Sequence, residues 1–279
     1  MDRQPGPRAI ASALSQAGRQ EATALAEYLR SLPATAANRQ SACTEWTIAE
    51  VAAHVASGGA FFRDAIQQAL AGEAQPALPA EQFGAQRSAA QEALRARPLG
   101  DLAGMIAATT EQLYTLVDNA GDEELMTPVK LPFGDWPIIQ VATVRLSELA
   151  LHHWDVRSVD DPAAKLSATS ANLILPGLAH FAAMISNRAA VAAAGSRSWQ
   201  LEVAGAHPST IGVRVAAGAL TVEHGAVDRP VATLALDAEQ LVRLIWGRLP
   251  LGPAIDAGAV DLTGDRTAAL ELNAIFQGV

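Results

Sequence analysis

The chain contains a single cysteine, Cys43, among its 279 residues. One thiol excludes an internal disulfide framework and any metal site built from several cysteines. Basic side chains are also scarce, because 20 Lys and Arg residues stand against 29 Asp and Glu residues, which gives a formal charge of −9. The basic residues form no cluster along the sequence. The composition therefore argues against a nucleic-acid partner and against binding to an anionic membrane surface.

No stretch of the sequence has the character of a membrane span or of an export signal. The longest uncharged run lies between Lys165 and Arg188, but serine, threonine, asparagine, histidine and proline residues interrupt it, which makes it a poor span. The first residues, MDRQPGPRAIASAL, lack the apolar core of a secretory signal. We therefore expect a cytoplasmic protein without a membrane partner.

Hydrophobic residues are abundant, at 50% of the chain, whereas 18% of the residues are charged. This composition excludes a disordered protein, and a prior of roughly 150 residues per domain suggests two domains. Long Ala- and Leu-rich stretches give way near residue 195 to short β-branched runs broken by glycine, proline and histidine. The sequence therefore predicts an α+β protein with a helical domain over residues 1–195 and a small α/β domain over residues 196–279.

The spacing of apolar residues predicts helices in the first domain over residues 8–31, 47–72, 83–96, 99–119, 138–159 and 167–193. The second of these begins with a capping box, in which Thr47 and Glu50 satisfy the first backbone amides. The stretch 127–137 has three prolines and a glycine, so we expect a loop there. Four principal helices of this length, joined by loops, are typical of an antiparallel bundle.

The second domain alternates strand and helix signals. Strands are predicted over residues 199–204, 211–216, 219–224, 231–236 and 258–263. Asp237 and Asp265 are positioned to cap two helices, which we expect to extend to Trp246 and Phe276.

Four charged or ionisable residues share one face of the predicted helix 138–159. Arg145, Glu148, His152 and Asp155 follow one another at spacings of 3, 4 and 3 residues, which places them on one side of a helix. Glu148 and His152 can therefore direct a carboxylate and an imidazole at one point. His153 lies roughly 140° away from Glu148 around the helix and cannot share that point. The same spacing is also typical of surface ion pairs worth a few tenths of a kcal/mol.

His54 lies in the middle of the predicted helix 47–72, surrounded by alanine and valine. A lone histidine in such a place is more often a satisfied core residue than a ligand. The core of a helical bundle is, however, where facing helices assemble metal sites. Together with Glu148 and His152 it would form a set of two histidines and one carboxylate, and three protein ligands leave a metal with an open coordination position.

Two segments of the sequence resemble a known family. They are Trp46-Thr47…Glu50…His54 and the run from Arg145 to Asp155, which reads RLSELALHHWD. Both resemble the mycothiol-dependent maleylpyruvate isomerase family, which belongs to the DinB/YfiT-like metal-binding bundles. The segment 260–265, VDLTGD, is similar to that family's sterol-carrier-like C-terminal domain. The resemblance covers nearly the whole chain and implies a DinB-like four-helix bundle followed by a small sterol-carrier-like α/β domain.

The resemblance also implies a chemistry. It assigns His54, Glu148 and His152 as ligands of zinc or another divalent metal, with a small thiol, usually mycothiol, as cofactor. The enzyme would be either a maleylpyruvate-type cis–trans isomerase or a thiol S-transferase acting on a small electrophile. The rival interpretation is a non-catalytic protein that binds small molecules or lipids and keeps a vestigial bundle site.

Several other residues have two interpretations. Arg145 and Asp155 either orient the metal ligands or form surface ion pairs. The pair Gly58-Gly59 allows the close approach of a ligand or of another helix. Arg248 resembles the family's C-terminal arginine motif, and we expect it to be a catalytic residue that holds negative charge; the alternative is an exposed arginine after a helix that Gly247 ends. Cys43 is expected to be a small buried or loop residue.

Overall fold

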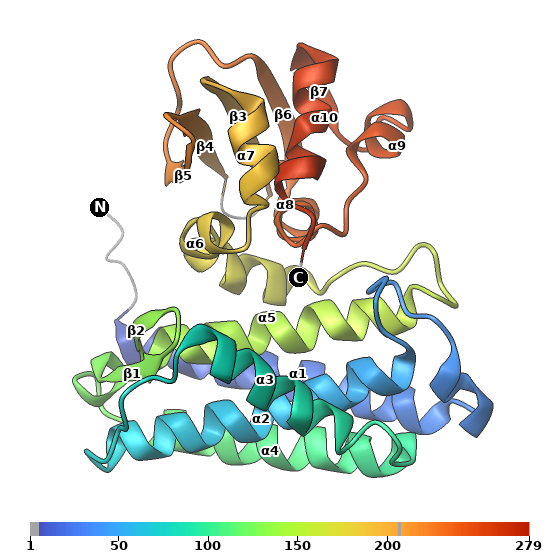
Figure 1. Cartoon of the computed structure of the whole chain (residues 1–279), viewed down its shortest axis with the longest axis vertical. Helices are drawn as coiled ribbons and strands as arrows, with labels where there is room; N and C mark the ends of the chain where they lie inside the picture. The colour runs from blue at the N-terminus through green and yellow to red at the C-terminus, as the bar shows by residue number, and fades with distance from the viewer. Residues whose placement is uncertain (1–5, 206–207, 279) are drawn as a thin grey trace. The chain divides into compact units, whose positions relative to one another are not determined.

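A computed structural model describes residues 6–205 and 208–278 of the chain (Figure 1). Its contacts divide the chain into two compact units, Met1–Leu166 and Ser167–Val279. The first is helical and the second combines helices with a sheet, so the predicted α+β class is confirmed. No helix in the described ranges is both long and apolar enough to cross a membrane.

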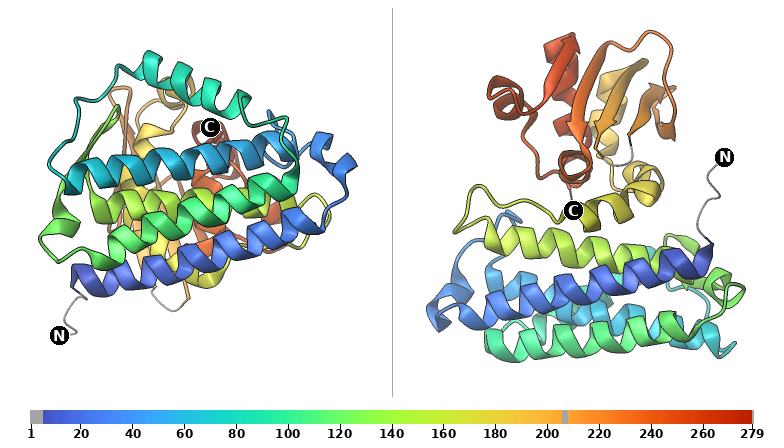
Figure 2. Two further views of the ribbon diagram at one scale, coloured as in Figure 1. Left: turned by 90° about the horizontal axis from the view of Figure 1, so that it is seen from below. Right: turned by 180° about the vertical axis from the view of Figure 1, so that it is seen from behind.

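The first unit is a four-helix bundle made of α1 (Pro7–Ser31), α2 (Ile48–Leu70), α4 (Leu99–Asn119) and α5 (Ile138–Arg157). Figure 2 shows the four helices side by side, and α1 and α2 each pack against both α4 and α5. Fully buried side chains from all four helices fill the core, among them Leu14, Leu25, Ile66, Ile106, Tyr114 and Leu146. The predicted bundle is therefore confirmed, with helix limits close to those expected.

The helices of the bundle run two in one direction and two in the other. The short helix α3 (Ala80–Glu92) carries the chain back along the outside of α2, so that α4 runs in the same direction as α2 (Figure 1). No residue of α3 is buried. A helix that buries so little gains little stability from packing, so its position depends on a small number of contacts, which include the site described below.

The stretch 127–137 is a β-hairpin, so the prediction of a loop there was wrong. Strand β1 (Pro128–Leu131) pairs antiparallel with β2 (Gly134–Pro137). The three prolines that suggested a loop lie at the first residue of β1, in the turn and at the last residue of β2, where proline costs little. Trp136 anchors the hairpin because its side chain is buried.

The second unit contains a five-stranded sheet in the order β5-β4-β3-β6-β7. Its strands are β3 (Arg197–Ala204), β4 (Ser209–Ala216), β5 (Ala219–His224), β6 (Ala232–Asp237) and β7 (Asp261–Gly264). Strands β3 and β6 are parallel, and the other neighbours are antiparallel. Asp237 caps α8 (Ala238–Ile245), and Asp265 caps α10 (Arg266–Ile275), so both predicted caps are confirmed. The short helix α9 (Leu251–Asp256) was not expected.

The helical segment 167–193, predicted as one helix of the first domain, differs from the expectation in two ways. It forms two helices, α6 (Ala168–Met184) and α7 (Arg188–Ala194), because Asn187 caps a new helix by accepting a bond from the amide of Ala190. Both helices belong to the second unit, where α6 packs against α8 and β5. Helical spacing reveals an apolar face but not the element that covers it. We therefore expected the boundary between the domains at residue 195, after these two helices, whereas the first unit ends at Leu166, before them.

Candidate functional site

The three side chains expected to act together are brought together by α2 and α5. Helix α2 contributes His54, and α5 contributes Glu148 and His152 one turn apart. The Nε2 atom of His54 lies 3.1 Å from Oε1 of Glu148, and the rings of His54 and His152 are 5.1 Å apart in an edge-to-face arrangement. Residues separated by about ninety positions in the sequence therefore form one cluster inside the bundle.

His152 is oriented by a carboxylate of its own helix. Its Nδ1 lies 2.8 Å from Oδ2 of Asp155, which is completely buried. A buried carboxylate favours the tautomer in which Nδ1 carries the proton, so the lone pair of Nε2 is left for another partner. Asp155 therefore orients a candidate ligand, as one of the two interpretations expected, and is not part of a surface ion pair.

Glu148 is held in its ionised form by three cationic or hydrogen-bonding neighbours. Arg145 donates from Nη1 to Oε2 over 2.6 Å, and Nη2 of Arg87 lies 3.5 Å from Oε1. Burial would raise the pKa of Glu148, but the bond to His54 and the charges of Arg145 and Arg87 outweigh it and lower the pKa well below its usual range. The carboxylate is therefore negatively charged at any physiological pH.

Arg145 is a completely buried guanidinium that fixes α5 against its neighbours. It donates to the backbone oxygen of Val55 in α2 and to Oγ1 of Thr110 in α4, besides Glu148. A buried charge is tolerated only when it is paired and hydrogen-bonded in this way. The residue thus positions the carboxylate of Glu148, and the alternative of a surface ion pair does not apply.

The two adjacent glycines of α2 make room for these charged groups. A Cβ atom at Gly58 would lie 2.5 Å from Oε1 of Glu148, and one at Gly59 would lie 2.4 Å from Oγ1 of Thr109 and 2.8 Å from Nη2 of Arg145. Atoms that are not bonded do not approach so closely. The expected close approach is therefore that of side chains from α4 and α5 to the backbone of α2.

The surroundings of His54 favour its neutral form. Burial lowers the pKa of His54, and the nearby His152 and Arg87 lower it further. The neighbouring Glu148 acts in the opposite direction but does not cancel these effects, so the pKa of His54 lies below its usual value. The indole of Trp46 packs on the ring of His54, with ring centroids 4.6 Å apart. A neutral imidazole that an aromatic ring holds in place is the form of histidine that binds metal ions.

Arg87 is a site residue that the sequence analysis did not identify. It extends from α3 towards Glu148, and its guanidinium lies 5.8 Å from the centre of the Phe61 ring. Its Nη1 is buried and has no hydrogen-bond partner in residues 6–205 and 208–278. It lines a cavity of about 410 Å³ bounded by α2, α3 and β1, together with Ser57, Phe61, Phe83, Gln86 and Lys130. A buried N–H group without a partner is costly, so this nitrogen is an available donor for a ligand.

The donor set at this cluster fits a divalent metal in its chemistry. Two imidazoles and a carboxylate, with Asp155 behind one imidazole, are a common set for zinc and for other transition metals. As the side chains stand, however, no group of three or more metal-binding residues in the described part of the chain is arranged closely enough to hold an ion. Glu148 is instead engaged by His54, Arg145 and Arg87, and these contacts would have to rearrange around a cation.

Two other residues have clear local roles. The ring of His153, next to His152, lies 3.0 Å from Oε2 of Glu21 in α1 and is not part of the cluster, as expected from the helix geometry. Cys43 is buried, in agreement with the expectation of a small buried or loop residue.

Arg248 lies in the second unit, just beyond α8. The amide of Arg248 donates to the oxygen of Arg243 and that of Gly247 to Leu244, while Gly247 has a φ of +74°. This is the Schellman pattern that ends helices, so the predicted role of Gly247 is confirmed. The guanidinium of Arg248 donates to the backbone oxygen of Trp246 and is partly buried. Its predicted role in catalysis stays a prediction.

Comparison with protein families agrees with the domain structure. The model of the mycothiol maleylpyruvate isomerase N-terminal domain matches residues 19–157, which include the whole histidine and carboxylate cluster. The model of the SCP-2 sterol transfer family matches residues 179–277. The helical bundle therefore matches the mycothiol maleylpyruvate isomerase N-terminal domain, and most of the second unit matches the SCP-2 sterol transfer family. The resemblance noted in the sequence is thereby confirmed.

Two solved structures have a similar fold. A crystal structure of the mycothiol-dependent maleylpyruvate isomerase is similar with a TM-score of 0.60 and 16% identity, over 85% of this chain and 89% of that one. A histidine-to-alanine mutant of a mycothiol-dependent maleylpyruvate isomerase is similar with a TM-score of 0.62 and 15% identity, over 91% and 92% of the two chains. No curated protein sequence matches the chain. At this identity the likeness establishes the fold.

Proposed function

We propose that the protein is an enzyme that uses a small thiol of the mycothiol type to isomerise a maleylpyruvate-like acid. The observation that carries the proposal is the convergence of His54, Glu148 and His152 beside Arg87. Arg87 lines a cavity, and its Nη1 has no hydrogen-bond partner among the described residues. The match of the bundle to the mycothiol maleylpyruvate isomerase N-terminal domain supports the choice of thiol and reaction. Transfer of the thiol to a small electrophile is the alternative outcome, distinguished by its product.

The chemistry requires a thiolate and a place for negative charge. A divalent metal, zinc foremost, held by His54, Glu148 and His152 would supply a Lewis acid that keeps the thiol deprotonated. The thiolate adds to a conjugated carbon–carbon double bond, rotation occurs about the resulting single bond, and loss of the thiolate restores the double bond. The thiol is regenerated, so no other reactant is consumed.

The residues of the chain position and polarise these reactants. Asp155 holds the ring of His152, and Arg145 holds the carboxylate of Glu148. Arg87 is placed to receive a carboxylate of the substrate through Nη1, which has no partner among the described residues, whereas its other terminal nitrogen faces Glu148 at 3.5 Å. A guanidinium forks onto a carboxylate through two parallel bonds.

The proposal is tested by turnover of maleylpyruvate with and without added mycothiol. We expect isomerisation only with the thiol, and equal rates for the wild type and Cys43→Ser, because the buried protein thiol is not the nucleophile. Full activity without added thiol, or loss of activity in Cys43→Ser with its fold intact, would contradict the proposal. Accumulation of a stable thioether in place of the trans acid would identify S-transfer instead.

Two arginines compete for the role of holding the substrate's charge. Removal of a single charge-stabilising donor costs about 10²–10³ in turnover, so we expect that loss, with metal content unchanged, from the alanine variant of whichever arginine, Arg87 or Arg248, holds the charge. Lysine at either position should recover only part, because the fork is lost. Arg95→Ala is the control, since Arg95 pairs with Glu50 and Glu92 near the end of α3. An alanine variant with wild-type kinetics removes that arginine from the mechanism.

A further inference from the structure

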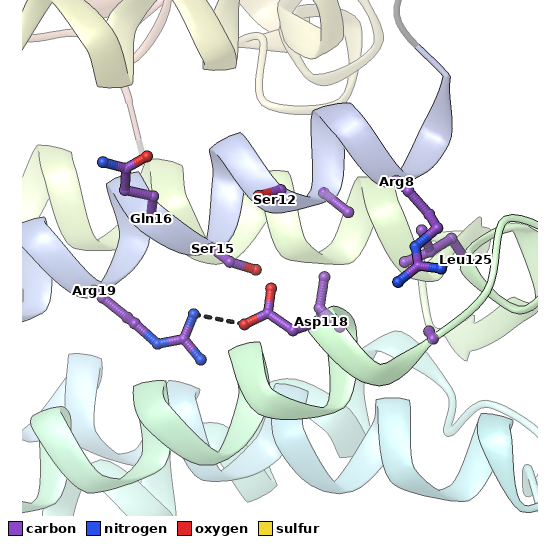
Figure 3. A pocket seen from close by; sticks show the side chains of 10 residues that line it. Arg8, Ser12, Ser15, Gln16, Arg19, Asp118 and Leu125 are labelled. Atoms are coloured by element: carbon purple, nitrogen blue, oxygen red, sulfur yellow. Dashed lines mark hydrogen bonds and ion pairs between the residues drawn. The ribbon is translucent and has the colours of Figure 1, made fainter.

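A second cavity lies between α1 and α4, and none of its lining residues belongs to the histidine cluster. Its volume is about 520 Å³. The polar part of its wall consists of Arg8, Ser12, Ser15, Gln16 and Arg19 from α1 and Asp118 from α4 (Figure 3). The residues from α1 recur at intervals of three or four, so one face of that helix is directed at the cavity. Val117 and Leu125 contribute an apolar part of the wall.

Ser15 provides the observation that points to a ligand. Only 1% of this residue is exposed, and its Oγ atom has no hydrogen-bond partner within the described part of the chain. Figure 3 shows the hydroxyl directed across the gap between the helices towards Asp118. A buried hydroxyl without a partner costs free energy, and alanine at this position in a helix would avoid the cost. A hydroxyl that a ligand satisfies explains why serine is tolerated here.

Asp118 presents an acceptor next to this hydroxyl. Its Oδ2 accepts from Nη1 of Arg19 over 2.8 Å, while both remaining nitrogens of that guanidinium bind Glu111. The other oxygen of Asp118 has no partner among the described residues. The charge of Arg19 is thus balanced by two carboxylates, and the local excess of charge at this end of the cavity is negative.

Arg8 provides the opposite charge at the other end. Its backbone amide donates to Asp122, but its guanidinium has no ion-pair partner among the described residues. Figure 3 shows the side chain directed at the cavity from the first turn of α1. Arg8 and Ser15 are seven residues apart, which corresponds to about 10 Å along a helix. Part of that distance is covered by the long arginine side chain.

We propose that this cavity binds a small zwitterion, with its acidic group on Arg8 and its amino group between Asp118 and Ser15. A simple anion would meet Asp118, and a simple cation would meet Arg8, so a ligand with separated charges fits both ends. The span between the two ends calls for several carbon atoms between the charges. An ω-amino acid or a short peptide-like molecule has this character, and the apolar wall accommodates its carbon chain.

The test uses three probes with the same carbon chain: 5-aminopentanoate, pentanoate and pentylamine. Their affinities are measured by calorimetry and by ligand-observed NMR on the full chain. Charge-assisted hydrogen bonds support a loss of about tenfold or more when one charged group is removed, so we expect 5-aminopentanoate to bind at least that much more tightly than either other probe. Pentanoate binding as tightly as 5-aminopentanoate, or no binding of any probe, overturns the proposal.

Three variants locate the binding. Arg8→Gln should abolish the advantage of 5-aminopentanoate over pentylamine, and Asp118→Asn its advantage over pentanoate. Ser15→Ala should weaken binding of both amines without lowering the thermal midpoint. Glu111→Gln is the matched control, because Glu111 also pairs with Arg19 but does not line the cavity. Equal loss in Glu111→Gln and Asp118→Asn would show that binding only reflects the state of Arg19 and would overturn the assignment.

Discussion

Helix α5 carries two adjacent buried histidines, and its two faces use them in opposite ways. On the face towards α2, the partner of His152 is Asp155, three residues along the same helix. On the face towards α1, the partner of His153 is Glu21, which belongs to the other helix. The contact distances are similar, at 2.8 and 3.0 Å. The first pair leaves the far side of the ring directed at His54, whereas the second pair links two helices.

The comparison shows that burial and a carboxylate partner do not by themselves mark a functional histidine. His152 differs because two further groups, the imidazole of His54 and the ionised carboxylate of Glu148, lie on the far side of its ring. The neighbouring pair of His153 and Glu21 contributes to the stability of the bundle. Substitutions that separate metal binding from stability therefore test the distinction directly.

The largest effect is expected from exchanging the two histidines for alanine. His152→Ala removes a ligand of the proposed site and should lower zinc affinity by more than about 100-fold, since loss of a residue that only orients a ligand costs about 10–100-fold. His153→Ala should keep its metal, but its free energy of unfolding should fall by about 1–3 kcal/mol, because the buried Glu21 loses its imidazole partner. Metal analysis and urea unfolding measure the two quantities. Equal metal loss in both variants would contradict the assignment of His152 to the metal site and of His153 to stability.

A smaller effect is expected at the contact between α2 and Glu148. Alanine at Gly58 would place a Cβ 2.5–2.7 Å from both carboxylate oxygens, so Glu148 must move or α2 must shift. Overpacking of this kind costs about 1–3 kcal/mol, and the displaced carboxylate should weaken metal binding. Gly104→Ala is the control, because that position in α4 has no atom within 4 Å of a new Cβ and should gain about 0.5–1 kcal/mol. Unchanged metal affinity in Gly58→Ala would contradict the proposed role of Glu148.

Much of the candidate site could be predicted from the sequence, because the residue spacing that indicates it is local or periodic. The spacing of Arg145, Glu148 and His152 determines their common face on any helix, and the Gly58-Gly59 pair indicated a close approach. Arg87 could not be found in this way. It acts from α3, a helix with no buried residue and hence no apolar stripe to orient it, and its contact with Glu148 spans about sixty residues.

The division of the chain was harder to predict for a related reason. The apolar stripe of α6 is equally compatible with a bundle and with the face of a sheet, and only tertiary contacts with α8 and β5 assign it to the second unit. The hairpin at 128–137 was missed because its prolines were taken as loop signals, whereas they lie at strand ends and in the turn. The first error arises from long-range partners that composition does not reveal, and the second from reading prolines without their place in the strands.

The orientation of His152 gives a more moderate prediction. Asp155→Asn keeps the size of the side chain but replaces the ionised acceptor with a neutral amide, so the tautomer of His152 is less strongly fixed. We expect zinc affinity to fall by about 10–100-fold, measured by competition with a chelator. A variant that unfolds like the wild type yet binds zinc as tightly would show that Asp155 serves only packing.

The smallest effect is expected where α1 meets the segment after α5, at an exposed cluster that contrasts with the buried pairs above. Asp160 accepts from Arg39 over 2.5 Å and from the hydroxyl of Tyr28 over 2.6 Å. Its bonds to Arg39 and Tyr28 lower the pKa of Asp160, while burial, followed by the bond to Asp160, raises the pKa of Tyr28 to about 12.

A carboxyl whose pKa is lowered on folding stabilises the protein above its unfolded pKa of about 3.9, and this stabilisation disappears as the pH falls through the folded value. Asp160→Asn should therefore be slightly less stable than the wild type at pH 7 and equal to it near pH 2, in urea unfolding followed by circular dichroism. Asp64→Asn serves as the control, because the ion-pair partner of Asp64 among the described residues is the adjacent Arg63 of the same helix. A difference for Asp160→Asn that persists unchanged at pH 2 would assign the effect to side-chain packing instead of charge.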